Sequence, residues 1–118
     1  MIAGGALAVV LVGLAGFQLR DDPRAVSFEG EIQPLFDRKC TACHPVSYPY
    51  LDLRRGRSYD QLVRVSAATA PAFERVLPGR PELSYVLTHP PDPSLRDLLT
   101  PAERELIAAW IREGARDN

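Results

Sequence analysis

The residues with the clearest chemical potential form the pentapeptide Cys40-Thr41-Ala42-Cys43-His44. Two thiols separated by two residues, with an imidazole directly after the second, make the C-x-x-C-H pattern of covalent c-type haem attachment. In that chemistry the thiols add across the two vinyl groups and the imidazole binds the iron. We therefore expect one covalent haem c, with Cys40, Cys43 and His44 binding the cofactor and His44 serving as a metal ligand.

Three other uses of these donors compete with haem attachment. Cys40, Cys43, His44 and His89 could supply the four ligands of a zinc site, but adjacent Cys43 and His44 do not fit the usual paired ligand spacings. A dithiol redox motif favours a βαβ setting, of which the sequence gives no sign. A structural disulfide would leave His44 without a role. Haem attachment is the interpretation that uses all three residues.

Two segments have the pattern of helices that could position this motif. Ahead of the cysteines, apolar residues recur at helical spacing, with Ser27 as a candidate N-cap. These residues are Phe28, Ile32, Leu35 and Phe36. They predict a short helix that runs into Cys40.

The C-terminal segment carries the strongest helix signals in the chain. Thr100, Pro101 and Glu103 predict an N-cap, a first helical residue and a capping box, and Gly114 stands where the helix should stop. One face of this helix is apolar. That face comprises Leu106, Ile107, Trp110 and Ile111.

The middle of the chain favours short helices and long loops. Residues 59–65 and 72–76 could each form a short helix, whereas prolines and a glycine between residues 78 and 93 favour loop. We see neither strand alternation nor a repeat. The expected fold class is therefore all-α.

Composition and hydropathy divide the chain into three parts. Residues 1–19 carry no charge and predict a transmembrane anchor, with an uncleaved signal segment as the alternative. Residues 20–27 form a polar linker, and residues 28–118 form one small domain. Because the net charge is −1 and no basic stripe is present, no nucleic-acid partner is expected.

Several separated segments resemble the class I c-type cytochromes, particularly single-haem domains of the planctomycete or environmental type. The segments are residues 31–36, the haem motif, 51–53, 78–84, 99–101 and 110–115. The resemblance implies a small cytochrome c fold with long Pro-rich loops, which here would follow one N-terminal transmembrane helix. It also implies that the first and last helices pack across each other, with Phe36 and Trp110 as their aromatic residues.

The resemblance also bears on the second axial ligand, where this chain departs from the family. Similar domains usually supply a Met from a Met-Pro sequence before the last helix, but Met1 is the only methionine here. His89-Pro90-Pro91 stands at that place, and His89 is the only histidine besides His44. We therefore predict bis-histidine ligation of the iron by His44 and His89. Imidazole in place of a thioether lowers the reduction potential.

These features predict an electron-transfer protein rather than an enzyme. It would be a membrane-anchored cytochrome subunit, on the periplasmic side, that serves redox partners in a larger respiratory or photosynthetic membrane complex. No small-molecule substrate and no catalytic residue are expected. The alternatives are a haem protein whose open iron site binds or senses small ligands, and a structural haem subunit of a membrane assembly.

Two groups of side chains are weaker candidates for contact with the haem. A haem propionate could pair with one arginine of a small basic group, although a solvated face explains the same residues. The group comprises Arg54, Arg55 and Arg57, and Arg80 is a separate candidate for the same pairing. The tyrosines that could line the haem pocket are Tyr48, Tyr50, Tyr59 and Tyr85.

Overall fold

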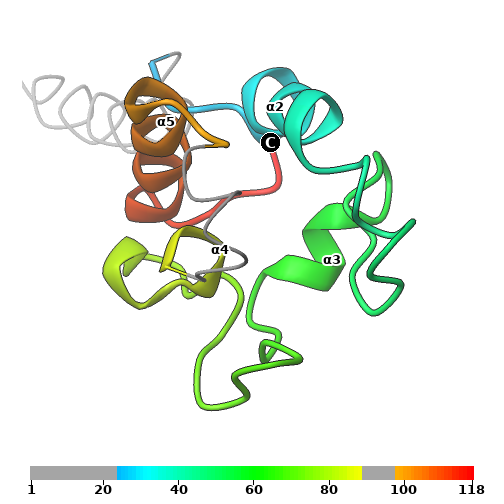
Figure 1. The fold of residues 1–118 in the computed structure, drawn as a ribbon. Coiled ribbons are helices and arrows are strands. Elements are labelled where there is room, and N and C mark those ends of the chain that lie inside the picture. The colour runs from blue at the N-terminus through cyan, green and yellow to red at the C-terminus, as the bar shows by residue number, and fades with distance from the viewer. Residues whose placement is uncertain (1–23, 89–97) are drawn as a thin grey trace, which may run out of the picture.

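The hydrophobic core lies between the helical segment ahead of the cysteines and the C-terminal helix. The computed structural model describes residues 24–88 and 98–118 (Figure 1). The first segment is a π-helical turn, η1 (Phe28–Ile32), that continues into α2 (Gln33–Lys39). The C-terminal helix is α5 (Pro101–Arg112). The ring of Phe28 packs on that of Trp110, with 5.1 Å between the ring centroids.

Three shorter elements complete the described part of the chain. They are α3 (Ser58–Leu62), the 3₁₀ turn η2 (Pro81–Leu83) and α4 (Tyr85–Thr88). In Figure 1, α4 lies close to α5, while α3 lies across the molecule near the segment that follows α2. An irregular stretch joins α3 to η2, and its only sheet-like pairings among the described residues are isolated bridges such as Val63 with Val76.

The structure confirms the start and the end of α5 that the sequence predicts. The Thr100 hydroxyl accepts a hydrogen bond from the Glu103 backbone N–H at 3.1 Å, and the Glu103 carboxylate accepts one from the Thr100 N–H at 2.9 Å. Gly114 follows the helix with φ of 108°, a left-handed conformation that glycine adopts without steric cost. The capping box and this glycine therefore set the length of α5.

The other predicted helices are only partly right. Ser27 caps the first helical segment, since its hydroxyl accepts from the Gly30 N–H at 2.9 Å, but that segment begins as a π turn. The helix expected at 59–65 is Ser58–Leu62. The prediction of a helix at 72–76 is wrong. The Arg75 N–H donates to the Val65 carbonyl at 2.7 Å, and this bond to a distant segment replaces a bond within a helix.

A buried polar side chain that the sequence analysis did not single out connects α2 to α3. Gln33 is fully buried; its amide nitrogen donates to the Leu53 carbonyl at 2.9 Å, and its amide oxygen accepts from the Ser58 hydroxyl. Buried amides are tolerated where their hydrogen bonds are made. Gln33 therefore fixes the loop after the C-x-x-C-H motif against both helices.

The predicted fold class is wrong. We expected an all-α small cytochrome c fold with long Pro-rich loops and one N-terminal transmembrane helix. Residues 24–88 and 98–118 instead form four short α-helices, of which α5 is the longest at 12 residues, and much irregular chain. Prolines and left-handed glycines such as Gly56 and Gly79 limit helix length.

The transmembrane part of that prediction concerns residues outside the described ranges. The expected anchor at 1–19 and the first residues of the 20–27 linker are among those not described. Among residues 24–88 and 98–118, no helix has the length and apolar character needed to span a bilayer.

Candidate functional site

The residues of the C-x-x-C-H motif open into one large cavity. The cavity has a volume of about 770 Å³, and Cys40, Cys43 and His44 all line it. This volume lies within the range of about 300–1,000 Å³ that is usual for cofactor and ligand sites. Its walls come from α2, the loop after the motif, the segment around Ala67, α4 and the beginning of α5.

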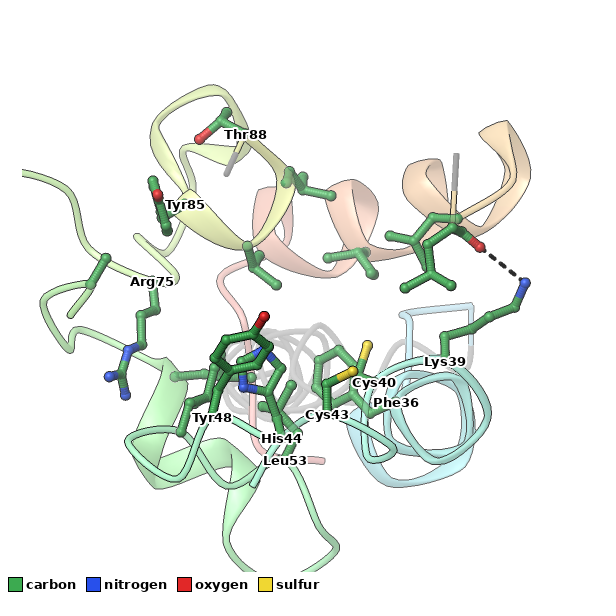
Figure 2. A pocket seen from close by; sticks show the side chains of 18 of the residues that line it. Phe36, Lys39, Cys40, Cys43, His44, Tyr48, Leu53, Arg75, Tyr85 and Thr88 are labelled. Atoms are coloured by element: carbon green, nitrogen blue, oxygen red, sulfur yellow. Dashed lines mark hydrogen bonds between the residues drawn. The ribbon is translucent and has the colours of Figure 1, made fainter. Parts of the chain in front are cut away.

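The end of α2 positions the two thiols. The Cys40 N–H donates to the Phe36 carbonyl at 2.8 Å, which closes the last turn of the helix. The N–H groups of Cys43 and His44 then donate to the Cys40 carbonyl at 3.1 and 3.0 Å. The chain thus turns tightly through the motif, and neither cysteine forms a disulfide. Figure 2 shows both thiols beside Phe36 on one side of the cavity.

The environment of Cys40 disfavours thiol–disulfide chemistry. Burial raises the pKa of this thiol to about 11, with further contributions from Cys43 and Glu103 that outweigh the opposing effect of Lys39. Dithiol redox motifs depend on a lowered thiol pKa, because the thiolate is the reacting form. Cys40 therefore stays protonated near neutral pH.

His44 presents an imidazole that lacks a partner for one nitrogen. Its Nδ1 atom is buried and has no hydrogen-bond partner among the described residues. Burial lowers the pKa of His44, against the opposite effect of backbone hydrogen bonding with Tyr48 and Leu51. The neutral imidazole is the form that binds metals. An orphaned nitrogen in a neutral ring on a cavity wall fits a metal ligand.

The described residues do not form a compact metal-binding cluster. No group of three or more His, Cys, Asp or Glu side chains in residues 24–88 and 98–118 is arranged to hold a metal ion. A structural zinc site needs four protein ligands around one point. A haem site differs from a zinc site in that it needs fewer protein ligands, because the porphyrin supplies the equatorial ligands of the iron and the thioether bonds lie at the porphyrin periphery. Cys40, Cys43 and His44 alone therefore do not complete a four-ligand zinc site, and His89, the fourth candidate ligand, lies outside the described residues.

Three cations and no described acidic residue line the cavity. The cations are Lys39, Arg75 and Arg104. Arg75 donates from Nη1 to the Gln61 carbonyl at 2.9 Å and from Nη2 to the Tyr50 carbonyl at 3.2 Å, and it forms no ion pair with a carboxylate of the described residues. Burial lowers the pKa of Arg75.

Figure 2 shows how these groups are distributed along the cavity. The two cysteines and Lys39 lie on one side of the cavity. His44 and Tyr48 lie in the middle, and Arg75 lies on the other side. A flat cofactor that met the thiols at one edge would therefore present its opposite edge toward Arg75.

The arginines that the sequence suggested as propionate partners already have acidic partners, and none of them lines the cavity. Arg54 and Arg57 face Asp52, with nitrogen–oxygen distances of 2.7 and 3.7 Å. Arg55 pairs with Glu29, and Arg80 with Glu82. Arg75 is the residue that the sequence analysis missed, since no local pattern marks an arginine in an irregular segment.

Three of the four candidate tyrosines line the cavity. They are Tyr48, Tyr50 and Tyr85. Tyr59 instead packs against both Phe28 and Trp110, and its hydroxyl donates to the Ala115 carbonyl at 2.7 Å. Its role is in the core.

His89, the predicted second ligand, lies outside the described residues. The residue before it, Thr88, lines the cavity at the end of α4. Leu98, the first described residue after the gap, lines the cavity as well. The assignment of His89 as a ligand stays a prediction.

Comparison of the chain with protein-family models, with curated proteins and with solved structures finds no match.

Proposed function

We propose that this protein carries single electrons on one covalently attached haem c. The observation that supports this most strongly is the shared cavity of Cys40, Cys43 and His44, with a buried, unpartnered imidazole nitrogen between the thiols and Arg75. When bound, the haem supplies the one-electron couple of its iron. The protein supplies attachment, axial ligation and the electrostatic surroundings.

The two thiols have the chemistry that attachment requires. Each S–H adds across one vinyl group, so that a sulfur–carbon bond forms and the hydrogen ends on the neighbouring carbon; no oxidant is consumed. A protonated, half-buried Cys40 is protected from competing disulfide formation before this addition.

Arg75 supports the carboxylate end of the same site. Arg75 is half-buried and has no carboxylate partner among residues 24–88 and 98–118, and such a guanidinium is costly unless an anion neutralises it. We propose that it faces the haem carboxylates, because it lies on the side of the cavity away from the cysteines. Tyr48 and Tyr85 line the same cavity, and their hydroxyls can add hydrogen bonds.

For the second axial position we propose His89. The residue before it lines the cavity, and the described cavity lining contains His44 as its only imidazole and no methionine. Bis-histidine ligation gives a lower potential than His–Met ligation. The protein would thus be a low-potential carrier.

The proposed location and partners follow from haem attachment. Covalent attachment of this kind takes place on the outer side of an energy-conserving membrane, so we propose that the domain works there. Its electron donors and acceptors would be redox proteins of a respiratory or photosynthetic membrane complex.

Spectroscopy of the purified holoprotein tests the axial pair. We expect a low-spin electron paramagnetic resonance signal in the oxidised protein and slow carbon monoxide binding to the reduced protein. His89→Ala should convert both to the behaviour of five-coordinate haem. A wild-type protein that is already high-spin would refute bis-histidine ligation and favour the alternative function, small-ligand binding at an open iron site.

A further inference from the structure

The imidazole of His44 contacts two tyrosine rings from the loop that follows it. The centroid of the Tyr48 ring lies 5.4 Å from that of the imidazole, with an interplanar angle of 37°, and the Tyr50 ring lies 6.2 Å away in an edge arrangement. The two tyrosine rings are 6.0 Å apart, so all three distances fall in the usual range for aromatic pairs. Figure 2 shows Tyr48 directly beside His44. All three side chains line the cavity.

Hydrogen bonds of the backbone fix the loop that carries these tyrosines. The Tyr48 N–H donates to the Cys43 carbonyl at 2.9 Å, so that the chain returns to the C-x-x-C-H motif within five residues. The Tyr48 carbonyl accepts from the Leu51 N–H at 3.3 Å, and the Tyr50 carbonyl accepts from Arg75 at 3.2 Å. Both tyrosines are therefore held in place relative to the motif.

Burial in the core does not account for these two tyrosines. Tyr48 is 43% exposed and Tyr50 is 49% exposed, whereas the imidazole that they contact has a buried Nδ1 atom. The rotation of a histidine ring about its last side-chain bond is otherwise broad. Contacts with two neighbouring rings restrict this rotation, so the orientation of the His44 ring is set before any ligand binds.

We propose that Tyr48 and Tyr50 are positioning residues that hold the His44 imidazole in the orientation in which it binds the haem iron. Groups around a metal ligand commonly orient it and tune its bond to the metal. An imidazole that is already oriented also binds more tightly, because less of the protein is in conformations that cannot bind. This inference rests on the proposed function, in which His44 is an iron ligand.

Electron paramagnetic resonance of oxidised holoprotein variants tests the orientation. The g values of the iron depend on how the plane of an axial imidazole is oriented over the porphyrin. We expect Tyr48→Ala to shift the g values and Tyr48→Phe, which keeps the ring, to retain those of the wild type. Tyr50→Ala should shift them less than Tyr48→Ala, because its ring lies farther from the imidazole.

Haemin titration of the Cys40→Ala/Cys43→Ala protein tests the same role without covalent attachment. Adding Tyr48→Ala should raise the dissociation constant for haemin by about fivefold, because one aromatic contact is lost. Adding Tyr48→Phe should change it much less. If Tyr48 acts through His44, Tyr48→Ala should have no further effect in a protein that also carries His44→Ala.

Phe73 offers a matched control for the loss of a half-exposed ring. It is 44% exposed, it pairs with Tyr85 at 6.2 Å, and it lies outside the cavity lining. Phe73→Ala should therefore leave the g values and the dissociation constant unchanged. If Tyr48→Ala does not fold, Tyr48→Leu, which keeps an apolar side chain but removes the ring, decides the question.

The outcomes separate this inference from the proposed function. A protein that binds haem, but whose Tyr48→Ala variant keeps the g values and the dissociation constant and only lowers the thermal unfolding midpoint, would refute the positioning role alone. Equal effects of Tyr48→Ala with and without His44 would also refute it, since the tyrosine would then act by direct contact with the haem. A chain that neither attaches haem nor binds haemin would refute the proposed function and this inference with it.

Discussion

At the scale of residues, the three side chains of the C-x-x-C-H motif line one cavity together with Lys39, Arg75 and Arg104. Cys40, Cys43 and His44 share a cavity, as their spacing implies. Arg75 and Arg104 could not be recognised, because their roles depend on contacts between segments far apart in the chain. The donors are specified by local spacing, whereas the cavity charges are specified by tertiary contacts.

Substitution of Arg75 should change the reduction potential. Without this cation, the haem carboxylates would be less neutralised, and their negative charge would favour the oxidised iron. We expect Arg75→Gln to lower the potential by on the order of 60 mV, which corresponds to a tenfold change in a one-electron equilibrium. Potentiometric titration measures this shift.

Charge-retaining and remote variants control for this prediction. Arg75→Lys should keep most of the wild-type potential. Arg80→Gln, which removes an exposed arginine paired with Glu82, should have no effect. Equal shifts in all three variants would show that Arg75 has no special electrostatic role.

Asp52 should make folding stability depend on pH in the acid range. Its carboxylate accepts from the Arg54 guanidinium and backbone N–H, and mainly the side-chain bond lowers the pKa from its ordinary value of 3.8 to about 2. Because the folded-state pKa is lowered, this stabilisation is fully present above about pH 4 and is lost as the pH falls toward 2.

Urea unfolding between pH 2 and pH 5 should therefore show a shallower pH dependence for Asp52→Asn than for the wild type. Asp60→Asn, at an exposed position in α3, should keep the wild-type slope. Identical slopes for the wild type and Asp52→Asn would contradict the contribution of this carboxylate.

At the scale of elements, helix ends that are set by nearby capping residues could be predicted from the sequence. Helix ends that are set by backbone hydrogen bonds to distant segments could not. The capping box of α5 and the Ser27 cap are confirmed, since each is contained within four residues. The expected helix at 72–76 is wrong, because its backbone bonds go to the segment after α3.

The capping box should contribute measurably to stability. Thr100→Ala removes the hydroxyl that accepts from the Glu103 N–H, and we expect it to lower the free energy of unfolding by about 1 kcal/mol. Thr100→Ser keeps an accepting hydroxyl and should remain close to the wild type. Chemical denaturation of the three proteins measures this difference; an equal loss in both variants would assign the effect to the lost methyl group instead.

At the scale of the whole molecule, the cavity is the feature that sequence patterns could not give. Its walls come from several segments that are far apart in the chain. The cytochrome c fold expected for residues 28–118 is wrong, whereas the transmembrane helix expected at 1–19 lies outside the described residues. Local helix signals do not specify how irregular segments such as 63–80 close around a site.

The cavity should accept haem without thioether bonds. A Cys40→Ala/Cys43→Ala protein keeps His44 and Arg75, so added haemin should raise its thermal midpoint in a concentration-dependent manner. The dimethyl ester of haemin, which lacks free carboxylates, should raise it less. A midpoint that responds to neither compound would contradict a haem-binding cavity.

Intact-mass spectrometry under denaturing conditions tests the central claim most directly, after the protein is produced in a host that attaches c-type haem. We predict a mass increased by that of one haem, with both cysteines unreactive toward a thiol-alkylating reagent, and no increase in the Cys40→Ala/Cys43→Ala protein. The bare polypeptide mass with two alkylated thiols would contradict the account.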